Sequence, residues 1–305
     1  MERAFLSSGD LIADRRASYA DMLFETGDYG AAADLMRQAL EITPNWTAGL
    51  FRLGEMHEAA GQGDAAAEAW RKLLQLEPDD RFGAGLKLAA TGHAALPETP
   101  PTAYVETLFD AYAPTFETAL LERLEYRVPE LLANAIKVAE PERRFRSVLD
   151  LGCGTGLMGP YFRAYADELV GVDLSEAMLQ KAAEKQVYDT LVKGDVNGLD
   201  TPAQSADLIV AADVFVYVGD LHRAFNNVAG ALVLDGLFAF SVENHSGDDE
   251  LILQPSLRYT HSESYVRRVL AENSMTLVSL QQEMIRLDRG EPLHGLIVVA
   301  KPNVY

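Results

Sequence analysis

The sequence predicts an α/β protein in which an all-helical arm precedes a doubly wound, mostly parallel sheet of seven strands. Three observations support this class. Residues 1–96 repeat a helical pattern, residues 97–101 are rich in proline, and from residue 102 helices alternate with short β-branched runs. Two successive strands follow the last predicted helix, so one of them should run antiparallel to its neighbour.

The arm is predicted from a period of 34 residues, which separates Gly27 from Gly61 and Pro44 from Pro78. Small residues stand at matching places around each glycine, where they would let antiparallel helices approach closely: Ala20, Ala32, Gly54 and Ala66. This pattern resembles tetratricopeptide repeats, with a third, incomplete unit near 81–92. The resemblance implies either a surface for a protein or peptide partner or a structural arm, and both interpretations stay open.

The proline-rich segment 96–101 cannot continue a helix. It sets the predicted boundary between a repeat domain over 1–96 and a second domain over 97–305. In the second domain, helices are predicted at 102–112, 115–123, 128–139, 156–166, 175–186, 221–233 and 262–272. Strands are predicted at 147–151, 168–173, 188–193, 207–212, 236–242, 275–286 and 295–301.

The charge balance argues against nucleic acids and membranes as partners. The 305 residues carry 26 Lys and Arg against 46 Asp and Glu, for a net charge of −20. A protein that neutralises many phosphates needs a basic surface, and no basic run is longer than Arg143-Arg144. One cysteine allows no internal disulfide, and neither an export signal nor a membrane-spanning run is recognised. We therefore expect a cytoplasmic protein.

The main functional signal is the segment 148–156, Val-Leu-Asp-Leu-Gly-Cys-Gly-Thr-Gly. Three alternating glycines at a strand-to-helix turn let the backbone approach a ligand closely. Asp173 ends the next strand, where a carboxylate can accept both hydroxyls of a ribose. Asp195 follows the third strand, where it could meet an adenine amino group beside the amide of Val196.

This series, together with the closing hairpin, resembles class I S-adenosylmethionine-dependent methyltransferases over about residues 140–301, which have a Rossmann-like fold. The resemblance implies S-adenosylmethionine as cofactor and S-adenosylhomocysteine as product. It assigns the glycine loop to the methionine end, Asp173 to the ribose, and Asp195 with Val196 to the adenine, while Asp150 would order the loop and approach the methionine amino group. The predicted cofactor set is Asp150, Gly152, Cys153, Gly154, Gly156, Asp173, Leu174, Asp195, Val196, Asp213 and Tyr112, with Cys153 acting as a small filler.

Two alternatives remain. Residues 154–159 also satisfy the G-x-G-x-x-G pattern of nicotinamide-dependent oxidoreductases. That pattern requires neither Asp150 nor Asp195, and the Asp150 carboxylate suits an ammonium but would repel a pyrophosphate. The second alternative is an interaction module that senses the cofactor without turnover. A methyltransferase acting on a small molecule or a protein is favoured.

The loop after the fourth strand, residues 211–221, should lie beside the transferred methyl group. It lacks the Asn/Asp-Pro-Pro-Tyr/Phe signature typical of enzymes that methylate amino groups of bases or glutamine. Phe215 and Tyr217 could line the pocket or belong to the core. The segment 102–139 resembles the lid of small-molecule methyltransferases, in which Tyr112 would close over the cofactor; its alternative is a packing stripe. With the repeats, this segment resembles bacterial methyltransferases that carry N-terminal tetratricopeptide repeats.

The six histidines show no metal-ligand spacing, so no metal is predicted. His245 follows the fifth strand and His261 precedes the last helix. Either could remove a proton from a hydroxyl acceptor. The alternative for each is a solvated loop histidine or a helix cap.

Overall fold

The computed structural model describes residues 7–198 and 201–303. The chain divides into two compact units, Met1–Thr107 and Leu108–Tyr305. The division falls inside helix α6 (Thr102–Tyr112), beyond the proline-rich segment. The first unit consists of helices that pack in sequence on one another: α1 (Leu11–Glu25), α2 (Tyr29–Ile42), α3 (Thr47–Ala59), α4 (Gly63–Leu76) and α5 (Ala84–Ala90).

Glycine separates the paired helices of the first unit. Gly27 and Gly61 have φ angles of +86° and +73°, which favour glycine and end α1 and α3. Gly54 allows α3 to approach α4, because a Cβ built there would stand 2.1 Å from Nε1 of the fully buried Trp70. The helical arm and its close packing are confirmed, while its identity as a tetratricopeptide-repeat domain stays a prediction.

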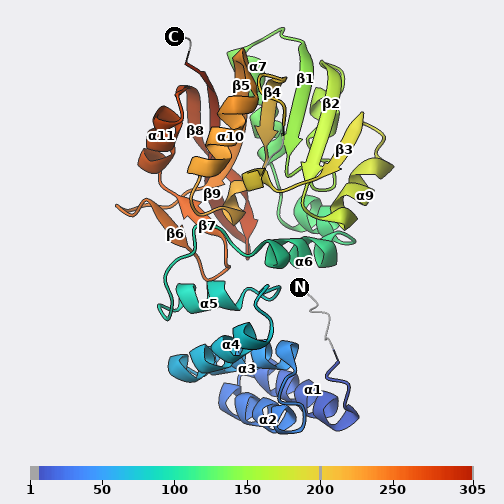
Figure 1. Cartoon of the computed structure of the whole chain (residues 1–305), viewed down its shortest axis with the longest axis vertical. Helices are drawn as coiled ribbons and strands as arrows, with labels where there is room; N and C mark the ends of the chain where they lie inside the picture. The colour runs from blue at the N-terminus through green and yellow to red at the C-terminus, as the bar shows by residue number, and fades with distance from the viewer. Residues whose placement is uncertain (1–6, 199–200, 304–305) are drawn as a thin grey trace. The chain divides into compact units, whose positions relative to one another are not determined.

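The second unit contains the predicted sheet (Figure 1). The strands lie in the order β3-β2-β1-β4-β5-β9-β8. The first four adjacent pairs are parallel, and β9 is antiparallel to both β5 and β8. The strands are β1 (Phe145–Leu151), β2 (Ala166–Asp173), β3 (Thr190–Lys193), β4 (Ala206–Ala211), β5 (Leu232–Glu243), β8 (Met275–Asp288) and β9 (Glu291–Pro302).

Helices surround this sheet on both faces. One buried cluster joins the sheet to α10 and α11, and another joins its opposite face to α7 and α8. The helices are α7 (Val128–Ala139), α8 (Gly159–Phe162), α9 (Glu176–Glu184), α10 (His222–Ala231) and α11 (Glu263–Glu272). Shorter elements are the π-helix Thr118–Arg123 and the 3-10 helices Val196–Gly198 and Phe215–Tyr217.

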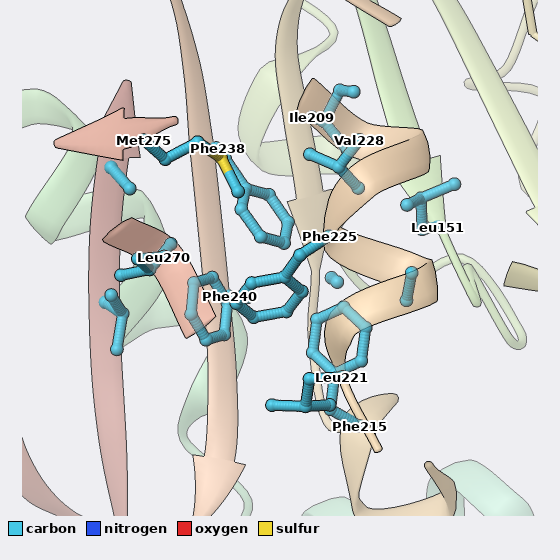
Figure 2. Close-up of a cluster of buried hydrophobic side chains, with 14 of the residues drawn as sticks. Leu151, Ile209, Phe215, Leu221, Phe225, Val228, Phe238, Phe240, Leu270 and Met275 are labelled. Carbon is cyan, nitrogen blue, oxygen red and sulfur yellow. The ribbon is translucent and has the colours of Figure 1, made fainter. Parts of the chain in front are cut away.

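Aromatic rings fill the core under α10. Figure 2 shows Phe238 and Phe240 of β5 against Phe225 of α10, and Phe215 beside them. The ring of Phe225 lies 4.9 Å from that of Phe240, and Phe215 lies 5.4 Å from Phe225, measured between centroids. Phe215 is fully buried in this cluster, so it belongs to the core and does not line a pocket.

One expected element was wrong, and one pair of strands was missed. The predicted helix 156–166 is reduced to the four residues of α8, because Gly156 has a φ of +84° and β2 already begins at Ala166. A second, two-stranded sheet was missed: β6 (Leu251–Leu253) pairs antiparallel with β7 (Tyr259–His261). Three-residue strands are too short to show an alternating pattern.

The described residues contain no helix that is both long enough and apolar enough to cross a membrane.

Candidate active site

The loop after β1 requires glycine at three positions. Gly152, Gly154 and Gly156 have φ angles of +61°, +54° and +84°, which residues with a Cβ rarely adopt. A Cβ built at Gly152 would stand 2.5 Å from Cγ2 of Val214, and one at Gly156 would stand 2.8 Å from Cε2 of Tyr188. A side chain at Gly152 or Gly156 would therefore strain the backbone and clash with Val214 or Tyr188.

This loop lies at the switch point of the sheet. β1 pairs with β2 on one side and with β4 on the other, and the chain order reverses between β1 and β4. In doubly wound sheets, ligands bind outside the carboxyl ends of the strands at such a point. Many of the predicted cofactor residues follow or end strands at this edge: Asp150, Gly152, Cys153, Gly154, Gly156, Asp173, Leu174 and Asp213.

Asp173 ties the end of β2 to the glycine loop. Its carboxylate accepts hydrogen bonds from the amides of Gly154 and Ser175, each at 2.8 Å. Burial raises the pKa of Asp173, while the backbone amides of Ser175, Gly154 and Leu174 act in the opposite direction. Leu174 thus contributes through its amide.

Asp150 has one satisfied and one unsatisfied oxygen. The side chain is 1% exposed, and Oδ2 accepts a hydrogen bond of 2.5 Å from the Tyr188 hydroxyl. Burial raises the pKa of Asp150 to about 7, against the lowering effect of Tyr188. Oδ1 is buried and has no hydrogen-bond partner. Buried polar atoms are nearly always paired, so this oxygen fits the amino group of a methionine moiety.

Cys153 packs beneath the loop. It is 6% exposed, and its Sγ lies 2.9 Å from a Cβ built at Gly171 of β2. Burial raises the pKa of its thiol, so the side chain remains protonated and fills space.

Asp195 and Val196 follow β3, two strands away from β1 in the sheet. Both are half-buried. The Asp195 carboxylate accepts a hydrogen bond of 2.8 Å from the Asn197 amide, and the Asn227 side chain of α10 donates to the Asn197 carbonyl at 3.1 Å. These contacts fix the turn that carries the predicted adenine contacts.

The segment between α6 and α7 covers the glycine loop. A Cβ built at Gly154 would stand 3.8 Å from Cε1 of Phe116. Lys185 donates to the Glu117 carboxylate and, at 2.8 Å, to the carbonyl of Thr155. Phe116 and Glu117 lie in the predicted lid segment 102–139, but they were not singled out as residues that contact the glycine loop, because no local spacing indicates that contact.

Tyr112 packs against Phe116 and therefore lies close to the same region. The two rings meet edge to face with centroids 5.3 Å apart. Burial raises the pKa of Tyr112, and the charges of Arg286, Arg123 and Arg258 oppose that shift. Tyr112 is half-buried beside Phe116, and its contact with the cofactor stays a prediction.

Asp213 has a strained backbone, with a φ of +60°. Its amide donates to Oγ of Ser241 at 2.9 Å, and its own Oδ1 is buried without a hydrogen-bond partner. Strained backbone of this kind is typical of functional loops. Four residues later Tyr217 packs edge-on against Phe109 at 5.1 Å, and burial raises its pKa to about 12.

The two predicted catalytic histidines differ in placement. His261 is fully buried, its Nε2 lies 3.0 Å from the Gly219 carbonyl, and burial lowers its pKa to about 4. This placement favours a structural role over proton removal from an acceptor. His245 bonds the Asp249 carbonyl through Nε2 at 2.8 Å, and its Nδ1 is buried without a partner. Nδ1 of His245 is therefore the better-placed nitrogen for accepting a proton.

Sequence reasoning missed a buried group of charges beside these residues. Glu243 ends β5 and Arg286 lies on β8, with side chains 2% and 3% exposed. Arg286 donates to Oε1 of Glu243, and Nε of Arg258 lies 3.1 Å from the same oxygen. The three residues come from distant parts of the sequence, so no local spacing indicated them.

In the part of the chain that the structure describes, no three His, Cys, Asp or Glu side chains gather where they could hold a metal ion.

Comparison with known proteins shows similarity to methyltransferases. Residues 149–240 match the methyltransferase domain family. The probable S-adenosylmethionine-dependent methyltransferase CRG1 of Saccharomyces cerevisiae is 28% identical over 196 residues, which are 60% of this chain and 62% of that protein. The malonyl-(acyl-carrier protein) O-methyltransferase of Salmonella typhimurium is 32% identical over 36% of this chain and 43% of that protein. The chain thus spans about two to three fifths of the length of these relatives.

Solved structures share the fold at low identity. The (4+2)-cyclase SpnF matches with a TM-score of 0.56 and 14% identity over 70% of this chain and 100% of that chain. The complex of the Haloferax volcanii Trm112 methyltransferase activator with a methyltransferase gives a TM-score of 0.51 and 18% identity over 64% of this chain and 98% of that chain. Residues 149–240 thus match a methyltransferase domain, and a relative that is similar over 196 residues is named a probable S-adenosylmethionine-dependent methyltransferase.

Proposed function

We propose that the protein transfers a methyl group from S-adenosylmethionine to a small-molecule or protein acceptor, leaving S-adenosylhomocysteine. The observation that supports this proposal most strongly is the buried side chain of Asp150, which has one oxygen without a hydrogen-bond partner. Asp150 lies two residues before the first of three alternating glycines with positive φ angles. A carboxylate in that position attracts an ammonium group and repels a phosphate. The relatives named as methyltransferases agree with this chemistry.

The predicted cofactor residues would each bind a different part of S-adenosylmethionine. Asp150 would bind the methionine amino group through Oδ1. Asp173 would turn its carboxylate toward the ribose hydroxyls, and Asp195 with the Val196 amide would bind the adenine. Phe116 and Tyr112 would exclude water above the glycine loop, because a closed site favours methyl transfer over competing reactions.

The chemical step requires mainly alignment. When bound, S-adenosylmethionine supplies an electrophilic methyl group whose leaving group is a neutral thioether. The chain must therefore hold the acceptor in line with that methyl group. A proton acceptor such as His245 is needed only for a hydroxyl or a protonated amine acceptor.

The two alternatives make different predictions. A nicotinamide-dependent oxidoreductase would need its loop to accept a pyrophosphate next to Asp150, which electrostatic repulsion opposes. A cofactor-sensing module would bind S-adenosylmethionine without consuming it. The likeness to SpnF, named a cyclase, illustrates that this fold alone does not fix methyl transfer.

Calorimetric titration and product analysis test the proposal together. We expect S-adenosylmethionine and S-adenosylhomocysteine to bind, and NAD to give no binding. Incubation of cell extract with enzyme and cofactor should then yield a product that gains the mass of one methylene group, detected by mass spectrometry. Binding of NAD alone would favour the oxidoreductase, and cofactor binding without any methylated product would favour the sensor.

We also propose that residues 1–96 form a tetratricopeptide-repeat domain, separate from the domain 97–305, and that it is chiefly structural. Deletion of 1–96 retains every predicted cofactor residue. A structural arm predicts aggregation of the truncated chain through newly exposed apolar surface. A soluble truncation with full cofactor affinity would instead favour a partner-binding arm.

A further inference from the structure

Two arginines share one carboxylate at the end of β5. Arg286 donates through Nη2 to Oε1 of Glu243, and Nε of Arg258 lies 3.1 Å from that oxygen. Two guanidinium groups against a single carboxylate leave one positive charge unmatched within this trio. Buried charge is costly unless opposite charges offset it, so the trio favours further negative groups, of which Asp213 is one.

Arg286 also has an unused donor, because its Nε is buried and makes no hydrogen bond within the described residues. Nε of Arg258 lies 3.1 Å from Oε1 of Glu243 as an ion pair, without the geometry of a hydrogen bond. Nearly all buried polar atoms in folded proteins are paired. A buried unpaired donor beside two guanidinium groups that share one carboxylate therefore indicates a place for a hydrogen-bond acceptor with negative charge, the group that guanidinium binds best.

The trio lies at the same edge of the sheet as the cofactor loop. Glu243 ends β5, which is parallel to β4 and β1, so its carboxyl end faces the edge where Asp213 and the glycine loop follow their strands. On β8, the residues on either side of Arg286 make backbone hydrogen bonds to the segment between α6 and α7. The amide of Arg127 donates to the carbonyl of Ile285 at 2.9 Å, and the amide of Leu287 donates to the carbonyl of Leu124 at 2.7 Å.

Asp213 limits the charge that this place can accept. Burial alone would lower the pKa of Arg286, but the charges of Asp213 and Glu243 raise it above its ordinary value. Asp213 is therefore within electrostatic reach of Arg286, although no ion pair joins them among the described contacts. Its negative charge opposes a dianion such as phosphate more strongly than a monoanion.

Acceptors of hydrogen bonds lie next to these donors. Oδ1 of Asn244, Nδ1 of His245 and Oδ1 of Asp213 are all buried without partners. Asn244 and His245 directly follow Glu243 in the chain, so these acceptors and the unpaired donor of Arg286 gather around the end of β5. A polar ligand that carries both an anion and a hydrogen-bond donor would satisfy both sets.

We propose that the methyl acceptor carries a carboxylate, and that Arg258 and Arg286 bind this carboxylate. The inference rests on the proposed methyl transfer, since it names the class of molecule that this site receives. Glu243 is the positioning residue that holds the two guanidinium groups together.

Calorimetry with simple probes tests the carboxylate directly. The full-length protein, saturated with S-adenosylhomocysteine, is titrated with benzoate and hexanoate, with benzamide and hexanamide, and with inorganic phosphate. We expect each acid to bind at least about tenfold more tightly than its amide, and phosphate to bind more weakly than the acids. Equal binding of acid and amide, no binding of either acid, or tighter binding of phosphate would overturn the proposal.

Variants assign the preference to the arginines. Arg258→Gln should remove most of the preference for acid over amide, while S-adenosylhomocysteine affinity stays unchanged. Arg286→Lys keeps a positive charge for the buried Glu243, so it should fold, yet lose binding of the acids at least about tenfold because lysine cannot reproduce the planar fork. The control is Arg267→Gln, whose arginine is half-exposed on α11 and pairs with Glu263. A preference that survives both Arg258→Gln and Arg286→Lys contradicts the assignment.

The same titrations separate this inference from the proposed function. If the wild-type protein fails to bind S-adenosylhomocysteine, the proposed function is wrong. If it binds S-adenosylhomocysteine but shows no preference for the acids, the carboxylate assignment alone is wrong.

Discussion

The carboxylate of Asp110, on α6, accepts a hydrogen bond of 2.5 Å from the hydroxyl of Ser175, the N-cap of α9. The same oxygen accepts a second bond of 3.3 Å from the amide of Ala177. Ser175 in turn donates its own amide to Asp173. Two successive hydrogen bonds therefore join the predicted lid to Asp173, the residue proposed to bind the ribose.

This chain predicts that Asp110 supports cofactor binding without contacting the cofactor. Asp110→Ala removes the bond that orients Ser175, so the dissociation constant for S-adenosylhomocysteine should rise by up to about tenfold, the scale of one hydrogen bond to a charged group. Calorimetry measures the change. Glu122→Ala, which removes an exposed acid from the same segment, should leave the affinity unchanged. Equal effects of the two substitutions would contradict a link through Ser175.

Asp173 should matter more than Asp110, because its carboxylate both fixes the glycine loop and is proposed to bind the ribose. Asp173→Ala should weaken S-adenosylhomocysteine binding by at least about tenfold, since each charge-assisted hydrogen bond contributes roughly 1.5–3 kcal/mol. Circular dichroism of the variant should show an intact fold. An unchanged affinity by calorimetry would refute the ribose assignment.

Tyr112 tests whether the segment above the loop acts as a lid. A lid becomes ordered when its ligand binds, so hydrogen exchange of residues 108–116 should slow when S-adenosylhomocysteine is added. Tyr112→Ala should then cost about 1–2 kcal/mol of cofactor affinity, the scale of one aromatic contact. Pure packing predicts a different result, in which thermal stability falls, affinity stays nearly constant and exchange does not respond to ligand.

The sequence predicted the sheet better than the acceptor side of the site. Alternating helices and strands, the glycine segment and the acids that end β2 and follow β3 are local patterns, and the structure brings them to one edge. Glu243, Arg258 and Arg286 meet only because β5, the turn between β6 and β7, and β8 converge.

Phe215 shows that a local pattern can also mislead. Its position in the loop after β4 favoured a pocket, but it packs against Phe225, Phe238 and Phe240 in the core. Such contacts depend on tertiary structure and leave no local spacing to find.

Asp150 predicts a pH dependence of cofactor binding. Burial raises its pKa to about 7, so the folded protein keeps a proton that the unfolded chain loses near pH 4. Between these values the contribution of Asp150 to the free energy of unfolding falls as the pH rises. Cofactor binding has the opposite trend, because the ligand's ammonium group favours ionised Asp150. The affinity for S-adenosylhomocysteine should be roughly tenfold weaker at pH 5.5 than at pH 7.

Two variants identify the group that titrates. Asp150→Asn should flatten the pH dependence, and Tyr188→Phe should move its midpoint upward, because the Tyr188 hydrogen bond lowers the pKa of Asp150. Calorimetry across this range in wild type and both variants measures the midpoints. The assignment fails if the Asp150→Asn profile retains the wild-type midpoint.

Gly54 tests the close packing of the helical arm. Replacing glycine by alanine within a helix normally adds up to about 1 kcal/mol of stability. At Gly54, however, the new Cβ would stand 2.1 Å from Nε1 of Trp70, and overpacking a tight core costs about 1–3 kcal/mol. Trp70 is fully buried, so its ring has little room to move aside. The steric cost should therefore exceed the gain, and Gly54→Ala should destabilise the arm.

The chain offers both a selective probe and a matched control for this prediction. Its two tryptophans, Trp46 and Trp70, both lie in the arm, so fluorescence during denaturation with urea reports the arm. Gly30 lies in α2, and a Cβ built there has nothing within 4 Å; Gly30→Ala should leave the midpoint unchanged or raise it, while Gly54→Ala should lower it. A Gly54→Ala midpoint equal to or above that of wild type would mean that α3 and α4 can separate without cost, and that the arm is not held by the small-residue contact that its repeat pattern predicts.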